Sequence, residues 1–231
     1  MSGGGGNPAS RLRGRGIVAR VGDATRRSYD RVAGRYAAEI GDELAGKPLD
    51  RALLDAFAEL VAGPVLDVGG GPGHVADYLA QRGVWVVNTD LSPVMCELAR
   101  QAGLPSVAAD MTALPFRSDV AGGIVCLYAV IHLDTAQRAA AYTSFRRALR
   151  PGGLGLIAFH TRDADTRMGG EAALSSWWDE PVALTFRFLD PSVESEALVA
   201  AGFDLVARLD RTPGPEEHAS DRTYLLVRRP T

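Results

Sequence analysis

The first quarter of the chain places its apolar residues at helical spacing. Val32, Tyr36 and Ile40 follow one another at intervals of four, a periodicity typical of one face of an amphipathic helix. Similar spacing continues to about residue 60, so two helices forming a helical cap are predicted over residues 24–60. Residues 1–23 combine a glycine run with four arginines and show no such period, which predicts a flexible basic tail.

Beyond residue 64, short apolar runs alternate with segments of helical pattern, an order typical of a parallel sheet covered by helices on both faces. Strands are predicted over residues 65–68, 84–89, 106–109, 123–128, 154–159, 203–210 and 223–228, and helices over residues 73–81, from 93, 134–149 and 192–201. The last two strands are separated by a segment with two prolines and a glycine and no helical period. They are therefore predicted to pair as an antiparallel hairpin.

Two helix starts carry specific signals. Ser92 stands directly before Pro93, and this pair is typical of an N-cap followed by the first helical position. Asp134 stands three residues before Gln137, the spacing of a capping box.

Residues 161–190 interrupt the alternation. They mix glycines, a proline and charged residues with the pair Trp177 and Trp178, which is unusual for a connection inside a compact domain. We interpret this segment as an insertion over the sheet edge, on the substrate side. Aromatic walls bind flat apolar molecules and exclude water, so the two tryptophans are candidates for the roof of a substrate pocket. Ordinary packing of the pair against the sheet edge is the alternative.

Composition narrows the class of protein. The chain has 231 residues, 46% of them hydrophobic, enough for one domain with a sizeable core. Its 25 basic and 28 acidic residues give a net charge of −3, so no global positive field favours nucleic acid. A role for the basic tail as a nucleic-acid or membrane arm is disfavoured. The two cysteines form no paired framework, and no signal sequence or membrane-spanning run is found, so a cytoplasmic protein is predicted.

The strongest chemical signal is a glycine-rich turn after the first predicted strand. Asp67 lies in that strand, and Gly69, Gly71 and Gly73 then occupy every second position. Glycine lets the backbone turn sharply and lets a ligand approach without interference from a Cβ atom, while the next helix presents free N–H groups. A steric strand-to-helix corner is the alternative for the turn taken alone.

Two further carboxylates follow at the ends of the next strands. Asp90 ends the second predicted strand, about 20 residues after the turn, where a carboxylate can accept both hydrogen bonds of a ribose diol. Asp110 ends the third and is followed by Met111. This pair offers a carboxylate to an adenine amino group and a thioether to its face, although a plain loop carboxylate beside a core methionine is equally consistent.

Together these residues resemble class I S-adenosylmethionine-dependent methyltransferases of the small-molecule type. Asp67-x-Gly69-x-Gly71-x-Gly73 is similar to the family's first motif, and Asp90 to its ribose-binding acid. The resemblance extends from about residue 28 to 230, including Leu149-Arg150-Pro151-Gly152-Gly153 before the fifth strand. It implies a methyltransferase domain over residues 24–231, with a doubly wound, Rossmann-like, seven-stranded α/β sheet, mostly parallel, and S-adenosylmethionine as cofactor.

The resemblance also implies a set of cofactor contacts. These are Tyr29, Tyr36, Asp67, Gly69, Gly70, Gly71, Gly73, Asp90, Leu91, Asp110, Met111 and Leu127. One departure concerns the fourth strand, where Val120-Ala121-Gly122-Gly123 replaces the family's usual Phe-Asp start. A second is Cys126-Leu127-Tyr128-Ala129 in place of an Asn/Asp-Pro-Pro-Tyr motif, which disfavours amino methylation of bases.

Methyl transfer is an in-line displacement, so the enzyme contributes mainly alignment in a dry pocket. A base assists when the acceptor is a hydroxyl. His132, after the fourth strand, and His160, after the fifth, are the catalytic candidates, and a structural role is the alternative for each. Tyr128, His132, Trp177 and Trp178 are the candidates for substrate binding. No carboxylate cluster indicates a metal site, and His218 is assigned no role.

The predicted function is O- or N-methylation of a small secondary metabolite, by a monomer or homodimer. One alternative is a protein that binds S-adenosylmethionine without methylating, such as a cyclase or a regulatory partner. A nicotinamide-dependent oxidoreductase is less consistent, because its glycines are spaced Gly-x-Gly-x-x-Gly and no Tyr-x-x-x-Lys motif is present. The methyl acceptor itself stays open.

Overall fold

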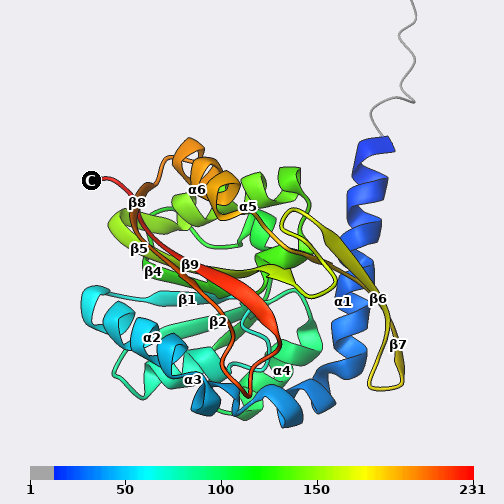
Figure 1. Cartoon of the computed structure of the whole chain (residues 1–231). Helices are drawn as coiled ribbons and strands as arrows, with labels where there is room; N and C mark the ends of the chain where they lie inside the picture. Colours follow the sequence, from blue (N-terminus) through cyan, green and yellow to red (C-terminus); the bar gives the residue numbers. More distant parts are fainter. Residues whose placement is uncertain (1–12) are drawn as a thin grey trace, which may run out of the picture.

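The computed structural model describes residues 13–231, with side chains from residue 22 onward. Its centre is a seven-stranded sheet with the order β3-β2-β1-β4-β5-β9-β8 (Figure 1). The strands are β1 (Val65–Val68), β2 (Val86–Asp90), β3 (Ser106–Ala108), β4 (Ala121–Leu127), β5 (Leu149–Asp163), β8 (Asp204–Arg211) and β9 (Ser220–Arg228). The first five run parallel, and β9 is antiparallel to both β5 and β8. This confirms the doubly wound class and the reversed last hairpin.

The strand order reverses between β1 and β4. Such a switch point opens a crevice at the carboxyl ends of the strands, where open α/β sheets bind ligands. The loop between β8 and β9 reaches the same edge, because Asp163 near the end of β5 pairs with Ser220 at the start of β9.

The helices that follow α1 (Arg13–Ile40) are α2 (Pro48–Leu60), α3 (His74–Ala80), α4 (Pro93–Gln101), α5 (Thr135–Ala148) and α6 (Pro191–Ala200), with short 3-10 turns η2 (Glu43–Gly46), η3 (Met111–Ala113) and η4 (Val130–His132). Helices α4 and α5 begin where the capping signals predicted. The Ser92 hydroxyl accepts the Met95 N–H at the start of α4. Asp134 and Gln137 exchange hydrogen bonds at the start of α5, which completes a capping box.

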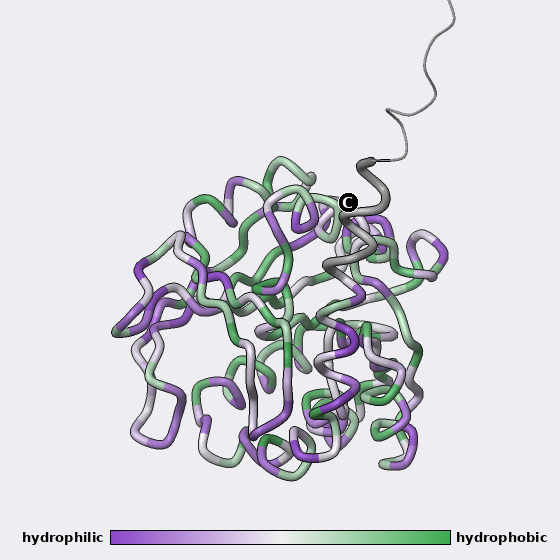
Figure 2. Tube along the Cα trace, turned by 90° about the vertical axis from the view of Figure 1, so that its right-hand side faces the viewer, coloured by the Kyte–Doolittle hydropathy of each residue, from purple (hydrophilic) through white to green (hydrophobic). Residues whose placement is uncertain are grey.

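Two hydrophobic cores cover the two faces of the sheet. One gathers around Tyr142 and Phe145 of α5, and the other around Phe57 of α2 and Leu79 of α3. All four side chains are buried, and Figure 2 shows the hydrophobic stretches concentrated in the middle of the molecule. Removal of this apolar surface from water, worth roughly 25 cal/mol per Å², is the main stabilising contribution.

Helix α1 (Arg13–Ile40) starts earlier than the sequence pattern predicted. Residues 13–23 were expected to belong to the flexible tail, but they continue the helix. Arginine and alanine are strong helix formers, and a helix docked further along extends with little cost once nucleated. The rest of the predicted tail, residues 1–12, lies outside the described residues.

The interrupting segment forms a separate antiparallel hairpin, with β6 (Glu171–Trp177) and β7 (Glu180–Arg187). Trp178 and Asp179 make its turn, and both have positive φ (53° and 66°), as a type I′ hairpin requires. Strand β7 packs along α1. The Ala183 N–H donates to the Ser28 hydroxyl at 2.8 Å, and Figure 1 shows the hairpin beside α1.

No helix within residues 13–231 is both long and apolar enough to cross a membrane.

Candidate active site

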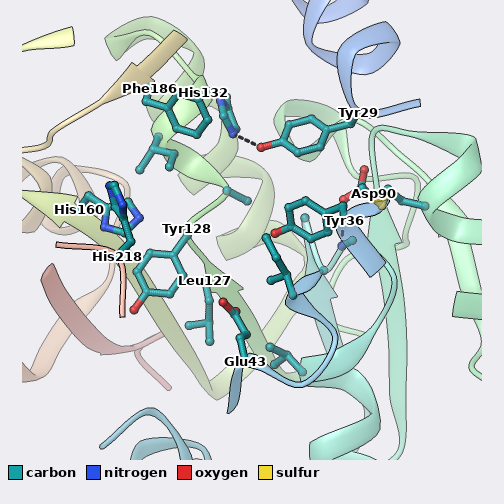
Figure 3. Close-up of a pocket in the computed structure, with 18 of the residues that line it drawn as sticks. Tyr29, Tyr36, Glu43, Asp90, Leu127, Tyr128, His132, His160, Phe186 and His218 are labelled. Carbon is teal, nitrogen blue, oxygen red and sulfur yellow. Dashed lines mark hydrogen bonds between the residues drawn. The ribbon is translucent and has the colours of Figure 1, made fainter. Parts of the chain in front are cut away.

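A cavity of about 930 Å³ opens at the carboxyl edge of the sheet. Its walls come from the turn after β1, the ends of β2, β4 and β5, helix α1, the β6–β7 hairpin and the β8–β9 loop (Figure 3). Most of the predicted site residues line it, namely Tyr29, Tyr36, Asp67, Gly69, Gly70, Gly71, Asp90, Leu91, Asp110, Met111, Leu127, Tyr128, His132, His160 and Trp177. The fold therefore brings together site residues that are separated by more than 140 positions in the sequence, from Tyr29 to Trp177.

The glycine turn has a steric reason at each position. Gly69 and Gly71 have positive φ (72° and 56°), and a Cβ atom on Gly69 would overlap that of Ala129. Gly71 faces the open side, with the ring of Tyr36 3.7 Å from where its Cβ would lie. Gly73 is the N-cap of α3, packs against Leu104 and is not part of the cavity wall. Because the turn carries no side chains, Gly69, Gly70 and Gly71 line the cavity with backbone alone.

Asp90 is held at the mouth of this turn. Its Oδ2 accepts the Gly71 N–H at 3.0 Å, and its Oδ1 accepts the Ser92 N–H at 2.7 Å. Each oxygen keeps a lone pair for a further donor. Burial raises the pKa of Asp90 to about 6 despite these hydrogen bonds, so the carboxylate is the main form at neutral pH.

Asp67 carries an unpaired acceptor. Its Oδ2 is buried and has no hydrogen-bond partner, and neither has the neighbouring Oδ1 of Asn88. Both oxygens lie beside Gly70, where a Cβ atom would overlap them. Burial raises the pKa of Asp67 to about 7. The floor of the turn therefore presents two oxygens that lack a donor.

Asp110 and Met111 both line the cavity at the end of β3. The Asp110 side chain caps η3, because its Oδ1 accepts the Thr112 N–H at 2.8 Å and the Thr112 hydroxyl at 2.7 Å. These bonds hold the carboxylate at the cavity rim.

His132 is held by both ring nitrogens. Its Nδ1 lies 3.0 Å from the Thr185 carbonyl oxygen, and its Nε2 lies 2.7 Å from the Tyr29 hydroxyl, as the dashed line in Figure 3 marks. Arg187 donates to the His132 carbonyl oxygen at 2.9 Å. Burial and the positive charge of Arg187 lower the pKa of His132 to about 4, against the hydrogen bond to Thr185. The imidazole is neutral at pH 7.

Aromatic rings surround this histidine. Tyr29 contacts Tyr36 and Trp177 edge to face, with centroids 6.0 and 6.1 Å apart, and Phe186 packs against His132 at 4.9 Å. Trp178 stacks on Trp177 at 4.7 Å but does not line the cavity. Of the two tryptophans, the structure therefore brings only Trp177 to the wall, with Trp178 behind it.

His160 belongs to another part of the cavity. Its ring stacks on Tyr128 at 4.8 Å, and its Nδ1 lies 2.7 Å from the Ser220 hydroxyl. Burial, together with the positive charges of Arg222 and Lys47, lowers the pKa of His160 to about 3. Figure 3 shows His160 beside His218, apart from the Tyr29–His132 pair.

A buried polar network below Tyr128 was not predicted from the sequence. Tyr224 donates to Asp50 at 2.5 Å, Arg211 donates to the same carboxylate at 2.6 Å, and Tyr128 lies 2.6 Å from the Tyr224 hydroxyl. Arg222 lies next to this network, and its Nε has no hydrogen-bond partner. One sequence signal for this network was available. Arg222 is a charged residue two positions before Tyr224 in β9, a strand that is otherwise mostly buried. His218, which was assigned no role from its sequence context, also lines the cavity.

The fold and this site define the class: a doubly wound α/β domain with a ligand-sized cavity at its switch point. The model of the methyltransferase domain family matches residues 65–153, which include the glycine turn, Asp90 and β4. Over these residues the chain matches methyltransferase domains, in line with its resemblance to class I S-adenosylmethionine-dependent methyltransferases.

Curated relatives agree over part of the chain. An uncharacterized methyltransferase of Mycobacterium sp. (strain JLS) is 34% identical over 132 residues, which cover 54% of this chain and 50% of the relative. A demethylmenaquinone methyltransferase of Mycobacterium sp. (strain KMS) is 30% identical over 129 residues, covering 54% of each. The chain thus spans about half the length of the curated relatives it matches.

Solved structures extend the likeness to the whole fold. The Burkholderia thailandensis 1,6-didemethyltoxoflavin-N1-methyltransferase, crystallised with 1,6-didemethyltoxoflavin and S-adenosylhomocysteine, has a TM-score of 0.70 and 20% identity. The alignment covers 100% of this chain and 94% of that one. At this identity the likeness concerns the fold alone.

Proposed function

We propose that this protein binds S-adenosylmethionine and transfers its methyl group to an oxygen or nitrogen of a small molecule. The observation that carries the proposal is the cavity, which joins a glycine turn with two carboxylates to an aromatic compartment around His132. The first part suits a nucleoside joined to an amino acid, and the second suits a flat acceptor.

The residues present fit this cofactor. Asp90 keeps lone pairs that can accept hydrogen bonds from a ribose diol. The unpaired Oδ2 of Asp67 can accept a hydrogen bond from a donor such as an ammonium group. At Gly69 and Gly70 a Cβ atom would overlap neighbouring side chains. Bound there, the cofactor supplies an electrophilic methyl group. The chain's part is to orient the acceptor and to keep water away from it, which Tyr36, Trp177 and Phe186 do as an apolar wall.

A small acceptor also agrees with the relatives and with the charge. The Burkholderia thailandensis enzyme was crystallised with 1,6-didemethyltoxoflavin, a small molecule, and S-adenosylhomocysteine. A net charge of −3 gives this chain no field that favours nucleic acid. We extend the same interpretation to a secondary metabolite as the acceptor.

Calorimetry with S-adenosylhomocysteine tests the cofactor assignment. Asp90→Ala should weaken binding by about 1–3 kcal/mol through the loss of charge-assisted hydrogen bonds, whereas Asp204→Ala, an exposed residue of edge strand β8, should not change it. Equal affinity of both variants, or binding of NAD in place of S-adenosylhomocysteine, contradicts the proposal. Binding without methyl transfer to any phenol, amine or carboxylate of a broad panel supports the non-methylating alternative.

A further inference from the structure

The hydrogen bonds of His132 determine which of its nitrogens carries the hydrogen. The Thr185 carbonyl oxygen, 3.0 Å from Nδ1, can only accept, so Nδ1 must be protonated. In the neutral ring Nε2 then has the lone pair, and the Tyr29 hydroxyl at 2.7 Å must donate to it. A substrate therefore cannot reach Nε2 directly, because Tyr29 already occupies it.

Tyr29 keeps two lone pairs on its oxygen after donating to His132. The side chain lines the cavity, on the side of the nearby Asp90 and Tyr36 in Figure 3. Edge-to-face contacts with Tyr36 and Trp177 hold its ring in place. A chain of hydrogen bonds thus runs from Thr185 of β7 through His132 of η4 to Tyr29 of α1. It ends in the cavity at the Tyr29 oxygen.

We propose that Tyr29 is a catalytic residue that relays a proton from a hydroxyl acceptor to His132. The inference rests on the proposed function and deepens it, because it assigns the acceptor atom as oxygen. The acceptor oxygen forms a bond to the methyl carbon while the carbon–sulfur bond breaks and leaves its electron pair on sulfur. The acceptor's proton passes to the Tyr29 oxygen, and the Tyr29 proton passes to Nε2 of His132. The imidazolium then releases this proton to water, so each turnover yields one proton.

The chemistry of the pair selects oxygen over an aliphatic amine. A hydroxyl that has gained a methyl group is a very strong acid until it loses its proton, so a weak base suffices. Neutral His132, whose pKa burial lowers to about 4, is such a base. A methylated aliphatic amine holds its proton with a pKa of roughly 10, as lysine does, and His132 gives no driving force for its removal.

Tyr29 acts as a relay rather than as a phenolate. Burial, followed by the neighbouring Tyr36 and the negative charge of Asp90, raises its pKa well above the ordinary value. The phenol therefore stays protonated and always has a hydrogen to pass on. The Thr185 carbonyl oxygen favours the imidazolium once it forms, whereas Arg187 opposes it and promotes release of the proton.

NMR of ¹⁵N-histidine-labelled full chain tests the hydrogen-bond chain without any acceptor. At pH 7.5, with S-adenosylhomocysteine bound, we expect His132 to be neutral with hydrogen on Nδ1, and Tyr29→Phe to shift its Nε2 resonance downfield, as expected for the loss of a donor. A His132 with hydrogen on Nε2, or charged at this pH, overturns the relay. Failure of S-adenosylhomocysteine to bind refutes the proposed function instead, so the two failures are distinguishable.

Kinetics then test the chemistry, with hydroxylated naphthalenes and quinones and their aminomethyl counterparts as acceptors. Tyr29→Phe and His132→Gln should each lower kcat on hydroxyl acceptors by ~100-fold, within the usual range of general base catalysis. The double variant should be no slower than the slower single one, because the two act as one unit. Tyr78→Phe, a surface tyrosine that donates to Asp55, is the matched control and should keep full activity. The relay is overturned if the double variant loses the product of the two single losses in kcat. It is also overturned if the aminomethyl acceptors are methylated faster than the hydroxyl acceptors.

Discussion

The Asp90 carboxylate accepts the backbone N–H of Gly71 at 3.0 Å, so the end of β2 and the turn after β1 are joined where the ribose is expected. This contact fixes the carboxylate before any ligand arrives, and burial raises its pKa to about 6. Preorganisation of this kind reduces the entropy lost on binding.

Cofactor affinity should depend on pH through Asp90. The ionised carboxylate accepts hydrogen bonds from ribose hydroxyls, so affinity should be full above pH 7 and fall as pH drops through about 6. Isothermal titration with S-adenosylhomocysteine at pH 5, 6, 7 and 8 measures this. In Asp90→Asn the affinity should be lower and should change less with pH, because the titrating carboxylate is gone. If the affinity of this variant changes with pH as steeply as that of the parent chain, the assignment is contradicted.

Asp67→Asn should stabilise the folded protein above pH 7. The folded pKa of about 7 is raised above the unfolded value of 3.8, so the folded state keeps a proton that the unfolded chain loses. Stability therefore declines as pH rises from about 4 to 7, by up to about 4 kcal/mol from this group. An amide also supplies a donor for the unpaired Oδ1 of Asn88.

Urea unfolding of both proteins between pH 4 and 8 is the measurement. We expect the difference in unfolding free energy between Asp67→Asn and the parent chain to grow with pH over this window. A difference that stays constant between pH 4 and 8 would mean that the pKa of Asp67 in the folded protein is not raised into this range.

Gly69→Ala should destabilise the fold far more than Gly83→Ala. Both glycines have positive φ, 72° and 80°, so both variants acquire about 1 kcal/mol of backbone strain. Only at Gly69 does the new methyl group overlap a neighbour, the Cβ of Ala129, whereas nothing lies within 4 Å at Gly83. Chemical denaturation should give an extra loss of about 1–3 kcal/mol for Gly69→Ala. Equal losses would show that the turn relaxes freely.

Trp177 and Trp178 should differ in their effect on an aromatic ligand. Trp177 lines the cavity, and Trp178 stacks on its outer face at 4.7 Å. Trp177→Ala should weaken binding of 2-naphthol to the cofactor-bound protein by ~10-fold, the scale of one aromatic contact, and Trp178→Ala by less than ~3-fold. Calorimetry measures both, with S-adenosylhomocysteine affinity as the control. A larger effect from Trp178 would place the acceptor elsewhere.

Signals from neighbouring residues predicted the turns and helix starts around the sheet. The glycine turn, the Ser92 cap and the Asp134 capping box depend on neighbouring residues and were correct to within one or two positions. Strand ends were less predictable, because β5 begins at Leu149 by pairing across an irregularity with Ala121 of β4. That pairing depends on register between strands rather than on local pattern.

The hairpin and the site contacts could not be derived in this way. The β6–β7 turn uses Trp178 and Asp179 in place of the usual Asn-Gly, and the ladder has a register shift between Leu174 and Ser176, which breaks the alternation that marks a strand. Tyr29 and His132 were both candidates, but 103 positions separate them. Their contact arises only when α1 and η4 meet through tertiary packing.

The β6–β7 hairpin lies outside the seven-stranded sheet and shares no ladder with it, yet it supplies Thr185, Phe186 and Trp177 to the aromatic compartment around His132. Replacement of this hairpin would therefore leave the main hydrogen-bond ladders and the carboxylates beside the turn intact. On the proposed function, acceptor preference would diverge, by natural drift or by design, through exchange of about 17 residues, while the part of the cavity around the glycine turn is inherited unchanged.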